Sequence, residues 1–442
     1  MAAGNKDLRN ICLNMLISTL EEGKLSGNVL NDTFRTEKLD KNERSFVKRL
    51  YTGVLEKLIY LDHEADLFSD IRVRKMKKVI RNILRMGIYQ LRFMDSVPAY
   101  SVINESVKLT RKRGFNNLCP FVNAVLRKAQ DIKEEPELPE NVKALVPEWL
   151  YILLNDQYGK EKAGAFFEAL KKERTEIFVR FNLNRGSRED IMDRLVRQHI
   201  QVREIPLDKY GAPSTDSSFA YGIKNFDSLT QLDVFKDGSI FVQDPGAMLC
   251  ILAGVKYIEK NTLTIDVCAA PGGKSLMMAQ LFPEARIISA DLTEKKVSLI
   301  RENIKRLDVS QIEPVCADAR AEDRDLREKA DVVIADLPCS GLGVAGKKPD
   351  ILYRLKESDL KQLKSLQKQI LSVCSTYVRP GGLLIYSTCT VNRSENEDNA
   401  VWFSDNFGFE FLEDRLLLPG EWEYDGFYYA YFRKQHKNGG KD

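Results

Sequence analysis

Apolar residues recur every three or four positions through residues 7–130, which predicts a series of amphipathic helices. The first of these repeats comprises Leu8, Ile11, Cys12, Met15 and Leu16. After residue 263 the pattern changes, and short runs rich in β-branched residues alternate with helical segments. Alternating strands and helices predict a doubly wound, mostly parallel sheet. The chain is therefore expected to be multidomain, with an all-α N-terminal part and a Rossmann-like α/β C-terminal part.

The segment between these two parts mixes short elements. Residues 131–140 (DIKEEPELPE) are acidic and contain prolines, which is typical of a linker. Further on, 177–182 and 202–205 are predicted strands and 191–196 a helix, which together indicate a small α+β subdomain. We predict three domains: a helical domain at 1–135, a linking α+β subdomain at 136–225, and an α/β domain at 226–442.

The first predicted strand of the α/β domain, 264–267, runs into a tight turn of small residues and then a helix. The turn is Cys268, Ala269, Ala270, Pro271, Gly272, Gly273 and Lys274. Its glycines allow a ligand to approach the backbone closely, and the N–H groups of a helix N-terminus favour an anionic group. The turn matches neither the G-x-G-x-x-G pattern nor the P-loop. Taken alone, it also fits an ordinary Gly-Pro turn.

Acidic residues end the next two predicted strands. Asp291 follows Gly273 by roughly 20 residues, the spacing at which an acid holds the ribose of a nucleotide. Asp318 ends the third strand and could accept a hydrogen bond from an adenine amino group. Either acid could instead be a helix cap. Their shared placement at strand carboxyl ends, where open α/β sheets bind ligands, favours a nucleoside site.

Cysteines mark the ends of the fourth and fifth predicted strands. Asp336 and Cys339 lie in Asp-Leu-Pro-Cys-Ser-Gly, and Cys389 lies in Ser-Thr-Cys-Thr, which an acidic helix start at 394–398 follows. A thiolate can add to C6 of a cytosine ring, with an acid such as Asp336 serving the ring at N3, and a second thiol can assist release. Both cysteines could equally be small buried hydrophobic residues.

The charge of the N-terminal part indicates what kind of partner the chain could bind. Residues 1–130 hold 24 Lys and Arg against 14 Asp and Glu, which suggests a polyanionic partner or a solvated helical surface. The basic segment 72–78 continues through Arg81 and Arg85 at helical spacing, as a phosphate-contacting face would. Arg180 and Asn182 could contact an RNA backbone, although structural roles are expected for them.

Several functions are not expected. The 8 cysteines are scattered without C-x-x-C spacing, and the chain has only 3 histidines, so neither a metal site nor a disulfide framework is predicted. No apolar run reaches the length of a membrane span, and the N-terminus lacks the features of a secretory signal. We expect a cytoplasmic monomer that is not associated with a membrane.

Three motifs in order, 269–274, 336–341 and 387–390, resemble those of the RNA 5-methylcytosine methyltransferases. In addition, 81–91, 98–107 and 121–127 resemble helices of NusB-like RNA-binding domains. Together they resemble the bacterial members of the family that act on 16S ribosomal RNA. One departure is the sequence Asp244-Pro245-Gly246-Ala247, where relatives more often have Asp-Ala-Ser or Glu-Ala-Ser.

This resemblance implies a role for each motif. S-adenosylmethionine would be wrapped by residues 268–274, with Asp291 at its ribose and Asp318 at its adenine. Cys389 would be the nucleophile and Cys339 would assist product release. Asp336 would lie near the methyl donor and the base, where Lys274 could pair with it and tune its proton affinity.

The expected function is methyl transfer from S-adenosylmethionine to C5 of a specific cytosine in 16S ribosomal RNA, through a covalent adduct between a cysteine and C6. DNA cytosine methyltransferases use the Pro-Cys cysteine as the nucleophile, so the presence of both cysteines favours RNA. Two alternatives stay open: a transfer RNA cytosine-5 methyltransferase, and a non-catalytic RNA-binding assembly factor.

Overall fold

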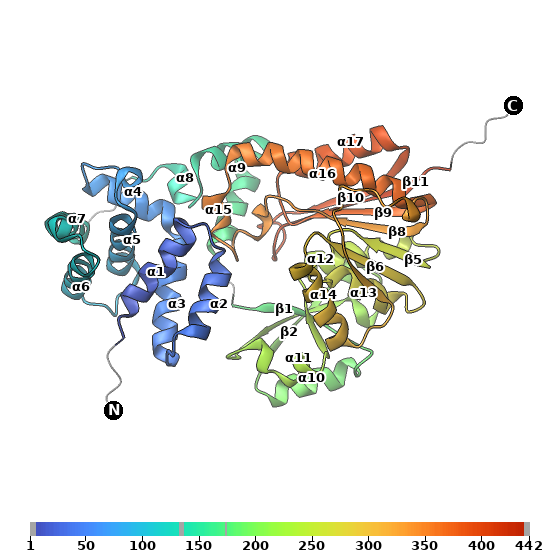
Figure 1. The fold of residues 1–442 in the computed structure, drawn as a ribbon, viewed down its shortest axis with the longest axis horizontal. Coiled ribbons are helices and arrows are strands. Elements are labelled where there is room, and N and C mark those ends of the chain that lie inside the picture. The colour runs from blue at the N-terminus through green and yellow to red at the C-terminus, as the bar shows by residue number, and fades with distance from the viewer. Residues whose placement is uncertain (1–5, 132–136, 173–174, 437–442) are drawn as a thin grey trace. The chain divides into compact units, whose positions relative to one another are not determined.

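The computed structural model describes residues 6–131, 137–172 and 175–436, and it forms two compact units (Figure 1). The helical unit extends to Lys171 and also includes Ala345–Lys356. The sheet unit comprises Lys172–Val344 and the chain from Glu357 onward. The described chain thus divides into two compact units, and the division into three domains stays a prediction.

The helical unit is built around α5, which is buried along most of its length and contacts five neighbouring helices. A methyl group on Gly87 would come within 2.6 Å of the Leu126 side chain, so this glycine lets α5 and α7 pack closely. The predicted helical fold of residues 7–130 is confirmed. Its helices are α1 Leu8–Leu20, α2 Ser26–Thr36, α3 Lys41–Glu56, α4 Leu58–Phe68, α5 Lys78–Phe93, α6 Ala99–Lys112 and α7 Cys119–Asp131, followed by α8 Glu140–Lys143 and α9 Glu148–Lys171.

A segment from the C-terminal half of the chain also belongs to the helical unit. Ala345–Lys356, which includes the short helix α15 (Ile351–Arg354), follows strand β8 of the sheet unit. Tyr353 packs against the helical core and its hydroxyl donates to the carbonyl of Leu55. Ser26 Oγ donates to Asp350 Oδ1 at 2.5 Å. Sequence patterns did not predict this excursion, because its anchoring contacts join residues about 300 positions apart.

The sheet unit begins with a small antiparallel sheet of strand order β2-β3-β1-β4. The predicted strands at 177–182 and 202–205 and the helix at 191–196 are confirmed, with slightly different limits. The strand β3, which pairs with both β1 and β2, was not predicted. The elements are β1 Ile177–Phe181, α10 Arg188–Arg197, β2 Gln201–Pro206, β3 Phe219–Lys224, α11 Asp233–Lys236 and β4 Ile240–Val242.

The larger sheet has seven strands in the order β10-β11-β9-β8-β5-β6-β7. Strands β5 to β9 are parallel, which confirms the predicted doubly wound, mostly parallel sheet, whereas β10 and β11 add antiparallel strands at one edge. The strands are β5 Leu263–Asp266, β6 Arg286–Asp291, β7 Ile312–Cys316, β8 Ala330–Asp336, β9 Val378–Thr388, β10 Phe409–Leu417 and β11 Phe427–Lys434.

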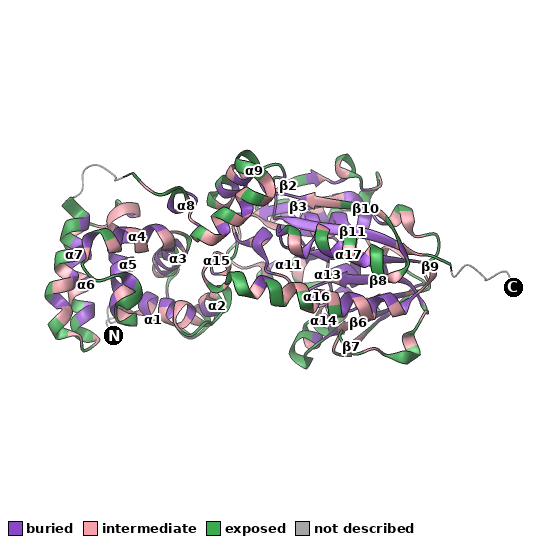
Figure 2. Cartoon of the chain, turned by 90° about the horizontal axis from the view of Figure 1, so that it is seen from above, coloured by how far each residue is buried: buried purple, intermediate pink, exposed green. Residues whose placement is uncertain are grey.

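Helices cover both faces of this sheet (Figure 1). The helices α12 (Pro245–Leu252), α13 (Gly273–Leu281) and α14 (Glu294–Leu307) pack into the core on one face. The helices α16 (Glu357–Tyr377) and α17 (Glu397–Phe407) pack into the core on the other. Figure 2 accordingly shows the central strands as buried and the outer helix surfaces as exposed. Loops at the strand carboxyl ends are therefore left to form a site.

The described residues lack some other structural features. None of the described helices combines the length and the apolar character that crossing a membrane requires. No group of three or more His, Cys, Asp or Glu side chains among the same residues is arranged to hold a metal ion. No disulfide joins the eight cysteines, all of which are described, and Cys12, Cys119, Cys250 and Cys374 are buried. Cys339 and Cys389 are only partly buried.

Candidate active site

The loop predicted to hold a cofactor lies at the carboxyl end of β5, between its two parallel neighbours β8 and β6. Gly272 adopts a φ of 102°, in the left-handed region, and α13 begins at the next residue. Under the loop, Ser275 Oγ donates to Asp266 Oδ2 at 2.7 Å, whereas Asp266 Oδ1 is buried and has no hydrogen-bond partner among the described residues. Burial raises the pKa of Asp266 to about 7.

The two acids predicted to bind a nucleoside have different surroundings. Asp291 is buried at the end of β6, where it accepts hydrogen bonds from Ala270 N at 3.0 Å and from Lys296 Nζ at 3.0 Å. Asp318 follows β7 and is paired with Arg320, whose Nη2 lies 2.6 Å from Oδ2. This hydrogen bond lowers the pKa of Asp318 to about 2. Asp291 is therefore joined to the loop, whereas Asp318 is held by its own neighbour.

Lys274 and Asp336 form an ion pair at this edge of the sheet, as predicted, with Nζ 2.5 Å from Oδ2. The Lys274 side chain is 8% exposed and that of Asp336 is 34% exposed, so the pair is accessible from the carboxylate side. Burial disfavours the Lys274 cation, but the charge and hydrogen bond of Asp336, together with Cys250 and Asp266, outweigh burial and raise the pKa of the lysine. Ser387 Oγ donates to the other Asp336 oxygen at 2.7 Å.

The two strand-end cysteines meet, with their Sγ atoms 3.4 Å apart. They meet because β8 and β9 are parallel neighbours in which Asp336 pairs with Ser387, so that both chains leave the sheet side by side. The hydrogen bond with Cys389, burial and nearby negative charge raise the pKa of Cys339 well above its ordinary value. Both thiols are partly exposed, and Cys389 also packs against the hydrophobic core.

Gly246, in the sequence that departs from relatives, makes room for an aromatic residue beside this ion pair. A methyl group on Gly246 would lie 2.8 Å from Phe427 Cβ. The Phe427 ring centre is 5.0 Å from Lys274 Nζ, within the range of a cation–π interaction. Asp244 caps α12 by accepting from the backbone of Gly246 at 2.9 Å. The departure therefore accompanies close packing of β11 against the site.

Sequence patterns missed a buried polar cluster behind the cysteines. Glu395 was read as part of an acidic helix start, but its side chain is fully buried and accepts hydrogen bonds from Ser340 and Gln367. Asn396 is fully buried beside it and bonds to both neighbours of Cys389. The only local signal was polarity next to the Thr-Cys motif, which does not separate a buried acid from a solvated helix start.

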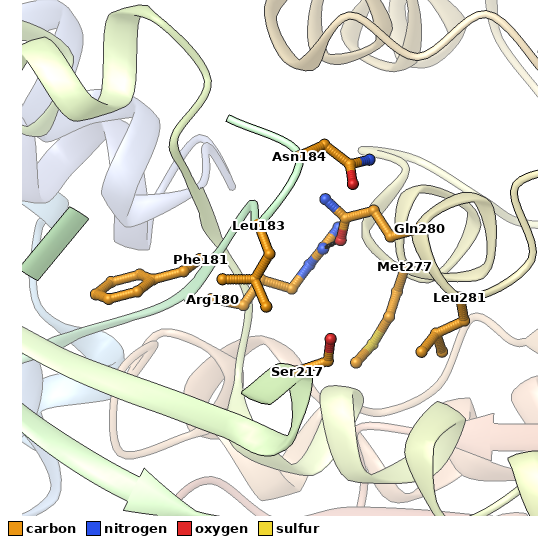
Figure 3. A pocket seen from close by; sticks show the side chains of 8 residues that line it. All are labelled: Arg180, Phe181, Leu183, Asn184, Ser217, Met277, Gln280 and Leu281. Atoms are coloured by element: carbon orange, nitrogen blue, oxygen red, sulfur yellow. Dashed lines mark hydrogen bonds between the residues drawn. The ribbon is translucent and has the colours of Figure 1, made fainter. Parts of the chain in front are cut away.

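Arg180 and Asn182 have the structural roles that were expected for them. Arg180 is 3% exposed, and its Nε donates to Gln243 Oε1 at 2.7 Å, while its Nη1 donates to Gln280. Burial, together with the nearby Arg306, lowers the pKa of Arg180 to about 9. A cavity of about 60 Å³ beside it lies between the small sheet and the later part of α13 (Figure 3). These side chains join the small sheet to the helix that follows the cofactor loop.

The arginines predicted to extend a phosphate-binding face in the helical unit are not available for that role. Arg81 is paired with Glu21, and Arg85 is buried with its Nε 2.6 Å from Asp62 Oδ1. Helical spacing placed both on one face, but that face turns toward other helices. The exposed part of the basic segment is Arg72, Arg74, Lys75, Lys77 and Lys78.

A parallel sheet with a Gly-rich loop after β5 and acids at the next strand ends is the frame of a nucleoside-cofactor enzyme. Residues 255–433 match the family described as 16S rRNA methyltransferase RsmB/F, and residues 6–131 match the NusB family. The fold and the match together define a methyltransferase that uses S-adenosylmethionine. Residues 255–433 therefore form an RsmB/F methyltransferase domain, and residues 6–131 form a NusB-family domain.

Named relatives agree with this assignment, and a solved structure shares the fold. The chain is 29% identical to the probable ribosomal RNA small subunit methyltransferase B of Bacillus subtilis, over 97% of this chain and 99% of that protein. It is 28% identical to the ribosomal RNA small subunit methyltransferase B of Vibrio cholerae, over 90% and 92%. The crystal structure of PH0851 shares the fold, with a TM-score of 0.81 at 22% identity over 98% of this chain and 100% of that one.

The residues present fit S-adenosylmethionine. The cofactor carries sulfonium and ammonium charges, and the strand ends supply the carboxylates Asp266, Asp291 and Asp336. One of these has a buried oxygen, Asp266 Oδ1, that lacks a partner among the described residues. A loop that closes on carboxylates suits a cationic nucleoside better than a phosphate-bearing one.

Proposed function

We propose that this protein methylates C5 of a specific cytosine in 16S ribosomal RNA through a covalent adduct between Cys389 and C6. The observation that carries the proposal is the 3.4 Å approach of Cys339 and Cys389 beside the Lys274–Asp336 pair. Two thiols at that distance serve addition and release better than they serve packing, because both are partly exposed. The names of the relatives support ribosomal RNA as the substrate.

Each side chain has a distinct task in this proposal. The Cys389 thiolate bonds to C6, and the ring gains negative charge that is neutralised by a proton at N3. Asp336 hydrogen-bonds the base at N3. Lys274, which is hydrogen-bonded to Asp336, supplies the proton that Asp336 passes to N3. Bound S-adenosylmethionine, held by residues 268–274 with Asp291 and Asp318, supplies the methyl group that C5 receives.

Product release needs a base and a leaving group. Cys339, as a thiolate, removes the C5 proton while the bond between C6 and Cys389 breaks. The Cys389 thiolate is regenerated, and N3 returns its proton to the Lys274–Asp336 pair. A cytosine within folded RNA must also leave its stack to reach the thiols. The exposed basic residues of the NusB-like domain are suited to hold the surrounding RNA backbone.

The test compares substitutions of the two cysteines, which should fail at different steps. Cys389→Ala is expected to abolish methyl transfer and covalent RNA capture, whereas Cys339→Ala is expected to accumulate a covalent RNA adduct that survives denaturing electrophoresis. Full activity of Cys389→Ala would contradict the assignment of the nucleophile. Sequencing both RNA classes for 5-methylcytosine after gene deletion shows whether 16S ribosomal RNA or transfer RNA is the substrate, because only the substrate loses the modification. An unchanged methylation pattern in both would favour a non-catalytic role.

A further inference from the structure

The carboxylate of Glu395 is fully buried, and neutral donors surround it. It accepts hydrogen bonds from Ser340 N at 2.9 Å, Ser340 Oγ at 2.6 Å, Gln367 Nε2 at 3.0 Å and Asn392 Nδ2 at 3.0 Å. Among the described residues, no lysine or arginine forms an ion pair with it. A buried carboxylate without a cation is costly, and four donors offset that cost only while each stays in place.

Three of these donors, on Ser340 and Gln367, hold the chain on either side of Cys339. The residue after it, Ser340, donates both its backbone N–H and its hydroxyl to Glu395. The residue before it, Pro338, accepts from Gln367 Nε2 at 2.9 Å, and the same Nε2 lies 3.0 Å from Glu395. The position of Cys339 in its loop is thus set through both neighbours.

Asn396 does the same for Cys389. Thr388 Oγ1 donates to Asn396 Oδ1 at 2.6 Å, and Asn396 Nδ2 donates to the carbonyl of Thr390 at 3.0 Å. Asn396 is fully buried, so water does not compete for these bonds. The hydroxyls of Ser340 and Thr390 lie 2.6 Å apart and connect the two loops.

We propose that Glu395 and Asn396 are positioning residues that serve different steps, Glu395 through the release thiol Cys339 and Asn396 through the nucleophile Cys389. This inference rests on the proposed function and extends it to residues outside the cysteine motifs. Misplacing a reacting group by 1 Å can cost about 10²-fold in rate. Hydrogen bonds that hold the chain on both sides of a reacting cysteine therefore control catalysis without touching the substrate.

Glu395 also acts on Cys339 through its charge. The groups that raise the pKa of Cys339 are Cys389 first, then burial, with a further contribution from the negative charge of Glu395. Once Cys389 is bonded to the base it no longer carries charge, and Glu395 is the negative group that still faces Cys339. A thiolate of raised pKa is a stronger base for the C5 proton.

Glu395→Gln and Asn396→Ala separate the two roles, with Glu410→Gln at an exposed site of β10 as the matched control. In single turnovers, Glu395→Gln is expected to methylate RNA but to resolve the adduct about 10- to 100-fold more slowly. Its release step should also move to lower pH, because removing the charge lowers the pKa of Cys339. Asn396→Ala is expected to slow adduct formation by a similar factor without accumulation.

Normal adduct resolution in Glu395→Gln, or accumulation in Asn396→Ala, would overturn the proposal. If either variant fails to fold, Ser340→Ala and Thr388→Val remove single hydroxyl donors to Glu395 and Asn396, respectively. Normal kinetics in these variants would equally overturn the proposal. A failure of the proposed function looks different, because then neither the unmodified protein nor Cys339→Ala forms any covalent RNA.

Discussion

Buried ion pairs occur in both units of this protein, but they face different surroundings. In the helical unit, Arg85 is 8% exposed and its partner Asp62 is 34% exposed, between the packed helices α5 and α4. In the sheet unit, Lys274 is 8% exposed and its partner Asp336 is 34% exposed, at the strand ends. Because the exposures are the same, the difference lies in position: a pair between helices contributes to folding, whereas a pair beside the cofactor loop can also hold substrate and move a proton.

Replacing Lys274 with methionine is the strongest test of this contrast. We expect methyl transfer to fall at least about 10²-fold, because Asp336 loses its proton source. Single-turnover methylation at saturating RNA measures the effect, and the melting temperature checks folding. Lys260→Met, at an exposed site, is the control. Near-normal turnover in Lys274→Met would mean that the pair has only a structural role.

Replacing Arg85 with methionine tests the other side of the contrast. Removing one member of a mostly buried pair should lower the free energy of unfolding by about 2–3 kcal/mol, since Asp62 keeps part of its solvation. Chemical denaturation measures the loss, with the exposed Arg111→Met as the control. The single-turnover rate of folded protein should be unchanged. A selective loss of RNA affinity without destabilisation would instead favour a phosphate contact.

Asp266 sharpens the comparison, because it is buried and forms no ion pair within the described part of the chain, although the charge of Lys274 acts on it. Its pKa of about 7 exceeds the value of 3.8 expected in the unfolded chain, so the folded state keeps a proton that the unfolded state loses. The free energy of unfolding should therefore fall as pH rises from about 4 to 7. Asp266→Asn should remove this decline. The melting temperature of the variant should therefore exceed that of the unmodified protein by a few degrees more at pH 8 than at pH 5. A difference independent of pH would contradict the assignment.

The exposed basic segment is expected to have the smallest effects. Replacing the exposed Arg74, Lys75 and Lys77 with alanine should weaken RNA binding by a few-fold each and lower the salt dependence of affinity, if each contributes one phosphate contact as we propose. Binding titrations at several salt concentrations measure both quantities, and Lys305→Ala serves as an exposed control. An unchanged salt dependence would show that RNA is bound elsewhere.

Much of the sheet unit could be predicted from the sequence, because its information is local. Short β-branched runs specify strands, and a parallel arrangement brings all their carboxyl ends to one edge. This was enough to predict that Lys274 meets Asp336, and it placed Cys339 and Cys389 at strand ends where they lie side by side. The roles proposed for these residues stay predictions until the variants are measured.

Other features were decided only by the tertiary structure. Helical periodicity gives the face on which Arg81 and Arg85 lie, but not whether that face meets solvent or another helix with a carboxylate. The same holds for the anchoring of Ala345–Lys356 in the helical unit.

Glu395 shows the limit most clearly. In sequence it belongs to a polar helix start, yet its carboxylate lies among donors from residues 28 and 55 positions away. Hydrogen-bond satisfaction of a buried group depends on which distant donors converge on it, and no local pattern records that convergence. The sequence by itself therefore determined the elements and the strand-end motifs, while packing decided which charged residues support the fold and which surround the two cysteines.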